Sequence, residues 1–125
     1  MLQSIVHYSF HFLVIGLIAF LYDPKHWKKY WLILLATMLV DLDHLAADPI
    51  FEAGRCSIGF HFMHSEIMVA VYLLGSIFLK NRILKLICIG LLFHMFTDLI
   101  DCIWNYAACA ECEMPPVLQK FNALF

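Results

Sequence analysis

Charged residues are scarce in this sequence. Asp, Glu, Lys and Arg make up 14% of its 125 residues, whereas hydrophobic residues make up 63%. A soluble domain averages about 25% charged and 45–50% apolar residues, so this composition excludes an ordinary soluble fold and indicates a membrane protein. The chain also lacks any run of basic residues and carries a net charge of −2, which argues against a nucleic-acid partner.

Two further features are absent. The first ten residues, MLQSIVHYSF, contain no basic segment and no small-residue cleavage site, so we expect a retained helix rather than a signal peptide. No internal repeat or low-complexity tract is present. The length of 125 residues predicts a single membrane domain over the whole chain.

Four apolar stretches predict an all-α protein, a polytopic membrane four-helix bundle. The expected helices cover about residues 3–22, 30–46, 62–80 and 83–105. A spanning helix needs about 20 residues, and the second and third stretches reach that length only if their Asp and His residues are included. Residues 116–125 have the apolar spacing of a short C-terminal interfacial helix, which could border a lipid entrance or serve as an ordinary anchor.

The basic residues indicate how the bundle is oriented. Six of the eight lie in the two linkers DPKHWKKY and KNRILK: Lys25, Lys28, Lys29, Lys80, Arg82 and Lys85. The positive-inside rule makes this side cytoplasmic. We therefore expect both termini and the loop 45–63 on the extracytoplasmic side.

Histidine and aspartate residues gather at the opposite end of the expected helices. At about 1.5 Å per residue from the basic side, His11, Asp41 and His94 lie about 15–16 Å deep, and a second layer lies at about 20–22 Å. The full set is His7, His11, Asp41, Asp43, His44, His61, His64, His94 and Asp98. Ionisable groups at such depths usually face a bundle interior, and imidazoles mixed with carboxylates are typical ligands of zinc.

The spacing of these residues places most of them on shared helix faces. The pairs are His7 and His11, Asp41 and His44, His61 and His64, and His94 and Asp98, with Asp101 continuing the last stripe. Asp43 does not fit, because it lies about 200° from Asp41 on an ideal helix and both can face inward only with a local distortion. Gly90, one turn before His94, would let another helix approach closely.

A purely structural polar network is the alternative to a metal site. A single buried histidine is more often a hydrogen-bonded core residue than a ligand. A network of nine such residues would leave carboxylates needing partners, because Arg55 and Lys120 are the only basic residues expected on that side. A bound metal ion would supply the missing positive charge directly.

Three motifs carry a resemblance to a known family. VDLDH (residues 40–44), HFMHS (61–65) and HMFTD (94–98) resemble the DxDH, HS and HxxxD elements of the YdjM-like membrane-bound metal-dependent hydrolases. The segments HYSFHF and RCSIGFHFMHS resemble a smaller, related bacterial family of unknown function along nearly the full length. The resemblance implies a metal-dependent hydrolase of the bacterial inner membrane, and a fainter similarity to zinc-dependent phospholipase C guides the chemistry only.

The candidate ligands are numerous enough for two zinc ions or two similar divalent ions, with Asp98 as a bridge. The expected metal ligands are His7, His11, Asp43, His44, His61, His64, His94 and Asp98. Asp41 or Asp101 is then expected as general base or as a partner of a ligand. Two such ions stabilise phosphoester displacement, and the depth of the site favours a phospholipid or another amphiphilic phosphoester as substrate.

Ser65 and Arg55 are candidate contacts of a substrate phosphate. Ser65 could equally make a hydrogen bond within its helix, and Arg55 could equally be a solvated loop residue. Membrane lipids are the expected partners, and the sequence gives no indication of an oligomeric state.

Four cysteines are expected on the extracytoplasmic side, where disulfides persist: Cys56, Cys102, Cys109 and Cys112. They permit three pairings, between which the sequence does not choose. A disulfide that ties the loop 45–63 to the C-terminal tail through Cys56 would order a lid over the site.

Two other classes of function stay open. Membrane bundles can hold b-type haem between facing histidines, although the companion carboxylates argue against a mostly apolar haem pocket. A metal sensor, transporter component or structural metal-binding protein would use the same ligands. A transport pathway should cross the membrane, yet the halves of the helices near the basic linkers lack ionisable residues, which favours a one-sided site.

Overall fold

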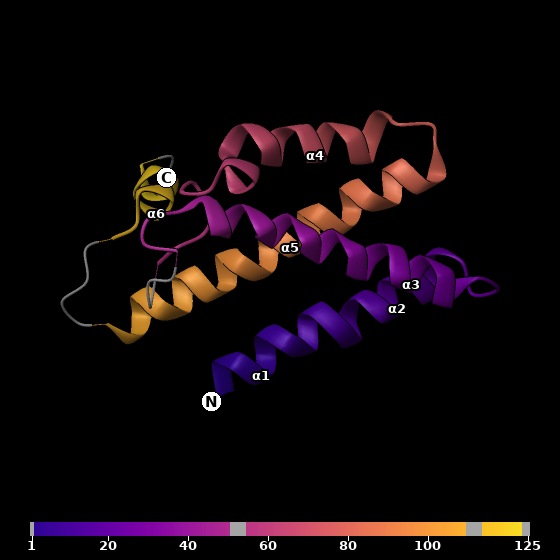
Figure 1. Ribbon diagram of the computed structural model, residues 1–125, viewed down its shortest axis with the longest axis horizontal. Coiled ribbons are helices and arrows are strands. Elements are labelled where there is room, and N and C mark those ends of the chain that lie inside the picture. Colours follow the sequence, from indigo (N-terminus) through magenta and orange to yellow (C-terminus); the bar gives the residue numbers. More distant parts are fainter. Residues whose placement is uncertain (1, 51–54, 110–113, 124–125) are drawn as a thin grey trace.

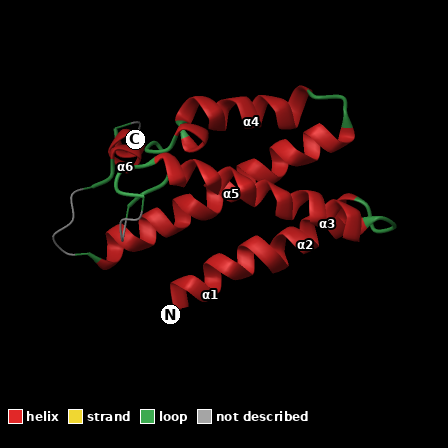
Figure 2. Cartoon of the chain, in the orientation of Figure 1, coloured by secondary structure: helices red, strands yellow, loops and turns green. Residues whose placement is uncertain are grey.

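The computed structural model describes residues 2–50, 55–109 and 114–123. Every regular element within these ranges is a helix, which confirms the all-α prediction (Figure 2). The elements are α1 (Leu2–Ser9), η1 (Phe10–Val14), α2 (Ile15–Tyr22), α3 (Trp27–Ala36), η2 (Thr37–Ala46), η3 (Phe62–His64), α4 (Glu66–Phe78), α5 (Arg82–Ala108) and α6 (Pro116–Asn122). The long helix α5 runs through the middle of the molecule and contacts α1, η1, α3, η2 and α4 (Figure 1).

The first three elements form one uninterrupted helix. α1, the π-helical turn η1 and α2 follow one another without a gap from Leu2 to Tyr22. The chain then turns at Asp23, whose Oδ1 accepts a hydrogen bond from the backbone N–H of His26 at 3.2 Å. The indole N–H of Trp31 in α3 donates to the carbonyl of Phe12 at 3.0 Å, so α3 returns alongside the first helix.

The second helix tightens halfway along its length. The hydroxyl of Thr37 donates to the carbonyl of Leu34 at 2.6 Å, and from Thr37 to Ala46 the helix continues as the 3-10 segment η2. At this position α3 lies close to Gly90 of α5. A Cβ atom on Gly90 would lie 2.8 Å from Leu34 and 2.9 Å from Thr37, so the close helix approach expected at Gly90 is present.

The helix expected over residues 62–80 is divided in the structure. η3 forms a short 3-10 turn, Ser65 is extended, and α4 begins only at Glu66. The Ser65 hydroxyl accepts a hydrogen bond from the backbone N–H of Met68 at 3.4 Å and therefore caps α4. A serine followed by an acidic residue starts a helix more readily than it continues one, which explains the difference.

In the part of the chain that the structure describes, two helices are long and apolar enough to cross a membrane, by length and composition. They are Leu2–Tyr22 and Arg82–Ala108, while α4 is apolar but shorter. Large apolar side chains also cover much of the outside, such as Leu13, Ile67 and Phe78, which are 72%, 76% and 73% exposed. A surface of this kind suits lipid better than water.

A disulfide joins Cys56, just before η3, to Cys102 of α5, so the loop is tied to α5 rather than to the C-terminal tail. Cys109 is also disulfide-bonded, Cys88 is free, and Cys112 lies outside the described residues. The structure has a helix, α6, over Pro116–Asn122, within the interfacial helix expected over residues 116–125. Leu124 and Phe125 lie outside the described residues.

Candidate metal centre

Histidine and aspartate side chains from four segments of the chain meet in the interior of the molecule. The first helix supplies His7 and His11, η2 supplies Asp41, Asp43 and His44, η3 ends in His64, and α5 supplies His94, Asp98 and Asp101. Within the described ranges these residues include three groups whose potential ligand atoms lie within 4.8 Å of one another. The sequence-based expectation of a shared cluster thus has a counterpart in the structure.

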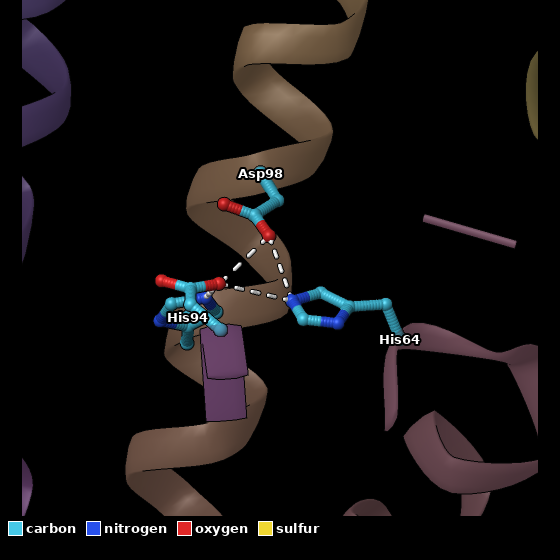
Figure 3. A group of neighbouring side chains, drawn as sticks. His64, His94 and Asp98 are labelled. Carbon is cyan, nitrogen blue, oxygen red and sulfur yellow. Dashed lines mark hydrogen bonds and ion pairs between the residues drawn. The ribbon is translucent and has the colours of Figure 1, made fainter. Parts of the chain in front are cut away.

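The central group consists of Asp41, His64, His94 and Asp98. The Nε2 atom of His64 lies 3.4 Å from Asp41 Oδ1 and 3.2 Å from Asp98 Oδ2. The Nε2 atom of His94 lies 3.0 Å and 3.5 Å from the same two oxygens. Figure 3 shows His64 approaching α5 from the side, with its ring nitrogen directed at the Asp98 carboxylate above His94. Both imidazoles are buried.

These separations are close to the edges of a coordination tetrahedron, and two of the four are slightly shorter. Zinc binds imidazole nitrogen and carboxylate oxygen at about 2.0–2.2 Å, and a tetrahedron of that radius has edges of about 3.3–3.6 Å. The four nitrogen–oxygen distances in the central group run from 3.0 to 3.5 Å. Two nitrogens and two oxygens thus lie close enough together to be ligands of one divalent ion.

A second group adjoins the first and consists of His7, His11 and Asp98. The His11 ring lies 4.4 Å from the His7 ring and 4.6 Å from the His94 ring, centroid to centroid. His7 Nδ1 contacts the carboxylate of Asp101. Asp98 belongs to both groups, so its carboxylate is shared between them.

Asp43 lies behind His64 instead of in the central group. Its Oδ2 atom accepts the backbone N–H of Met63 at 2.8 Å and lies 3.1 Å from His64 Nδ1. A carboxylate on the far nitrogen of a metal-bound histidine is a recurrent arrangement that fixes the orientation and tautomer of the ring. The sequence favours Asp43 as a ligand and Asp41 as a base; in the structure Asp41 belongs to the central group and Asp43 to a neighbouring group with His44 and His64.

The 3-10 geometry of η2 explains why both aspartates reach the centre. In a 3-10 helix each residue turns by about 120°, so two residues turn by about 240° and their side chains are about 120° apart the shorter way round. The corresponding angle on an ideal α-helix is about 160°. The local distortion that Asp43 requires is therefore the tightening that begins at Thr37.

The third group consists of Asp43, His44 and His64. His44 Nε2 lies 3.8 Å from Asp41 Oδ1 and 3.9 Å from Asp43 Oδ1, so it is farther from the carboxylates than the central histidines are. The His44 ring stacks on the His61 ring at 3.9 Å. His61, an expected ligand, belongs to none of the three groups found among the described residues. Burial, and then the neighbouring His44 imidazole, lower the pKa of His61.

One buried nitrogen gives an independent test of whether a metal fits. His11 is 2% exposed, and its Nε2 atom makes no hydrogen bond to any residue that the structure describes. Leaving such an atom unsatisfied in a protein interior costs about 1–3 kcal/mol. A metal ion in the second group would satisfy it, so the donor set fits a second ion next to the central one.

A cavity of about 270 Å³ opens onto the centre. It is lined by His7, Asp41, His44, Asp98 and Asp101 on the side of the centre, and by Arg55, Ser57, Cys102 and Asn105 around them. The Arg55 side chain also donates to the carbonyl of Pro49 at 2.8 Å and lies over the Phe60 ring. Ser65, the other expected substrate contact, does not line this cavity and caps α4 instead.

Three polar residues near the centre were not among the expected site residues. Asn105 accepts a hydrogen bond from the Gln3 amide at 2.9 Å, and Gln3 also donates to Asp101 at 3.4 Å. Both could have been found from spacing, because Gln3 is four residues before His7 and Asn105 is four after Asp101. Ser57 lies in a loop, where no periodicity could indicate its position.

The fold and the centre together define an all-helical protein with long apolar helices and a buried cluster of histidine and aspartate. The sequence matches a family of unknown function, DUF6122, over residues 1–105, and the chain belongs to this family. No curated protein and no solved structure matches the chain. The family match agrees with the small family of unknown function expected from the motifs, and it covers every member of the three groups.

Proposed function

We propose that this protein is a membrane-embedded, metal-dependent hydrolase with a dinuclear centre of the zinc type. The observation that carries the proposal is the set of four nitrogen–oxygen distances, 3.0–3.5 Å, among Asp41, His64, His94 and Asp98. Hydrogen-bonded ion pairs need only one short contact for each nitrogen. Here each of two nitrogens approaches the same two oxygens, as ligands of one ion do.

The roles of the residues follow from this geometry. The central group would hold one ion, and His7, His11 and Asp98 would hold a second, with Asp98 shared by the two groups. Asp43 orients His64 from the far side of its ring, and Asp101 does the same for His7. Asp101 also lines the cavity outside the central group, so we assign proton transfer to Asp101 rather than to Asp41.

A dinuclear centre of this kind supports hydrolysis of phosphoesters. Bound divalent ions acidify a water molecule towards neutral pH and stabilise both the attacking and the leaving oxygen of an in-line displacement. Arg55 lines the cavity above the centre and supplies a cation for an anionic group of the substrate. A phosphoester with an apolar portion, such as a phospholipid, is the substrate class that this combination favours.

The membrane arrangement is part of the same proposal. In our arrangement, four segments cross the bacterial inner membrane. Two are the helices that are long and apolar enough to span it, and the other two are α3–η2 and α4. The turn between α2 and α3 and the turn between α4 and α5 lie at one end of the molecule, away from the N-terminus and α6 (Figure 1). Both turns carry the basic residues, so the centre is assigned to the extracytoplasmic half.

The test joins metal content to turnover. Purified protein should contain about one to three equivalents of zinc or a similar ion, and it should hydrolyse a member of a phospholipid and phosphoester panel. A chelator should abolish this activity, and zinc or manganese should restore it. Asp98→Asn should lose both metal and activity, whereas His26→Ala should keep both, because His26 lies in the turn between α2 and α3 with its side chain 66% exposed.

Two results would contradict the proposal in different ways. Native protein that is metal-free and equally stable would remove the metal centre itself. Metal-loaded protein that turns over no phosphoester, ester or amide in a broad amphiphile panel would remove the hydrolase activity. A non-catalytic metal-binding membrane protein would then be the preferred function.

A further inference from the structure

The facing sides of the first helix and α5 stay polar beyond the proposed metal ligands. Gln3 lies one turn before His7, and Asn105 lies one turn after Asp101. The amide nitrogen of Gln3 lies 2.9 Å from Asn105 Oδ1 and 3.4 Å from Asp101 Oδ1. Neither Gln3 nor Asn105 belongs to a group that could hold an ion, so metal binding does not account for this pair of amides.

The Asp101 carboxylate determines which way both amides point. An ionised carboxylate only accepts hydrogen bonds, so Gln3 directs its NH₂ group at Asp101. The same NH₂ group donates to Asn105, which therefore presents its oxygen to Gln3. The NH₂ group of Asn105 is then the part of this side chain that can donate to a bound molecule, and Gln3 fixes its orientation.

Asn105 and Asp101 line the cavity of about 270 Å³ that opens onto the metal centre, whereas Gln3 lies outside its lining. Asp98 lines the same cavity. At about 1.5 Å per residue, Asp101 lies about 4–5 Å and Asn105 about 10–11 Å from Asp98 along α5. A molecule whose phosphate lies beside Asp98 would therefore bring the group attached to that phosphate to Asp101 and Asn105.

A fixed donor next to a carboxylate acceptor selects the chemistry of that group. Hydroxyls both donate and accept, so a hydroxylated group can accept from the Asn105 NH₂ and donate to Asp101. An ammonium group could donate to Asp101 but cannot accept from Asn105. The Asp101 charge would repel a second phosphate, and an apolar group would leave both side chains without a hydrogen bond to it.

We infer that the substrate is a phosphoester of a hydroxylated alcohol, such as glycerol or another polyol, and that Asn105 and Asp101 bind its hydroxyl groups. Asn105 contacts the substrate, and Gln3 is the residue that positions Asn105. The inference rests on the proposed function for the place of the phosphate, whereas recognition of the hydroxyls does not depend on turnover. A lipid headgroup and a water-soluble polyol phosphate share this chemistry.

The experiment measures binding to the full-length, metal-loaded protein in detergent by native mass spectrometry. The probes are phosphatidylglycerol and phosphatidylpropanol with identical acyl chains, which differ only in the headgroup hydroxyls, and mass also separates intact lipid from any cleavage product. We expect about 5–10-fold stronger binding of phosphatidylglycerol. Glycerol 3-phosphate and propyl phosphate form the matching soluble pair, and the pair that shows the preference identifies the source of the substrate.

Substitutions of Asn105 and Gln3 make the experiment specific. Asn105→Leu removes the donor at similar size and should bind the two lipids equally. Asn105→Asp can still accept from Gln3 but has no N–H group, so it should shift the preference to phosphatidylethanolamine, whose ammonium group donates to carboxylates. Gln3→Leu frees the Asn105 amide and should lower the preference for hydroxyls several-fold. Asn122→Asp, the same change of charge at an exposed position of α6, should keep the wild-type preference.

Metal content, measured on each sample, shows whether the centre is intact. If Asn105→Leu does not retain metal, Asn105→Asp, which keeps the hydrogen bond to Gln3, decides the question. Equal binding of phosphatidylglycerol and phosphatidylpropanol together with equal binding of the soluble pair, or an unchanged preference in Asn105→Asp, would overturn the inference even if the protein hydrolyses phosphoesters. A preference for hydroxyls that depends on Asn105, in a protein that turns over no substrate, would leave the hydroxyl site standing and contradict the hydrolase proposal.

Discussion

Asp41 and Asp98 approach the same two imidazole nitrogens, and this arrangement sets the chemistry of the centre at the scale of single residues. Two neighbouring carboxylates, one of them buried, repel each other. A divalent cation between them would compensate both charges at once. It would also leave the proton of His64 on Nδ1, 3.1 Å from Asp43, and so complete a carboxylate–histidine–metal arrangement on that side.

The different roles of Asp41 and Asp43 can be tested by matched substitutions. Asp41→Asn removes a ligand oxygen, so we expect it to lose the central ion and all activity. Asp43→Asn removes only the partner of His64, so we expect it to retain metal with an affinity lowered about 10–100-fold. Metal content after dialysis against graded chelator concentrations separates the two outcomes. If Asp41→Asn keeps its metal while Asp43→Asn loses it, the assignment reverts to the one that the sequence favours.

The intervals between histidine and aspartate residues along the sequence were enough to predict much of the cluster. His94, Asp98 and Asp101 lie on one regular α-helix, where intervals of three and four residues translate directly into a shared face. The roles of Asp41 and Asp43 could not be separated in this way, because they depend on a change of helical pitch that no periodicity reveals. Ser57 and the exclusion of His61 from the three groups depend on the path of a loop.

At the scale of elements, the close contact between α3 and α5 holds the two sides of the centre in register. Gly90 of α5 lies against Leu34 and Thr37, at the point where α3 becomes η2. One turn later on the same helix comes His94. A shift of α3 away from α5 would therefore move Asp41 relative to His94, whose Nε2 atom is now 3.0 Å from Asp41 Oδ1.

Gly90→Ala should show this coupling. The new Cβ would lie 2.8 Å from a methyl carbon of Leu34 and 2.9 Å from that of Thr37, so these buried side chains or the helices that carry them must shift, and overpacking of this kind costs about 1–3 kcal/mol. The gain in helix propensity, about 1 kcal/mol, offsets only part of that cost. We expect a lower unfolding temperature in detergent and a lower metal content.

Gly16→Ala is the matched control for this experiment. Its Cβ would lie 3.4 Å from Trp31, an ordinary contact, so the variant should be as stable as the wild-type protein or slightly more stable. Equal behaviour of the two variants would show that the contact at Gly90 does not position the centre.

The division of the third expected helix was also readable in part from the sequence. Ser65 followed by Glu66 is a helix-start signal, and α4 does begin there. The apolar run after it, together with the i,i+3 spacing of His61 and His64, favoured an earlier start. The short turn η3 instead directs His64 to the centre and leaves His61 beside His44.

At the scale of the whole molecule, the basic residues and the histidine and aspartate cluster are separated along the helices. The two turns with most of the basic residues lie at one end (Figure 1), and the histidine and aspartate residues lie farther along the helices that these turns join. This polarity was predictable, because it follows from residue order along apolar helices of similar length. The tie of the loop to α5 was not, because four cysteines leave three pairings open.

The polarity leads to a prediction about orientation in the membrane. Single cysteines are introduced as Lys28→Cys and Lys80→Cys, one in each basic turn, in a background in which the free thiol is removed by Cys88→Ser. Because the positive-inside rule places these turns in the cytoplasm, an impermeant thiol reagent added to intact cells should leave both unlabelled and should label both after permeabilisation. Gln119→Cys, on the exposed side of α6, should react in intact cells and serves as the positive control.

Labelling of both turns in intact cells would reverse the orientation and move the candidate metal centre to the cytoplasmic half of the membrane. Labelling of one turn but not the other would mean that α3–η2 and α4 do not both cross, and the four-crossing arrangement would have to be replaced by one in which only the two long helices span the bilayer.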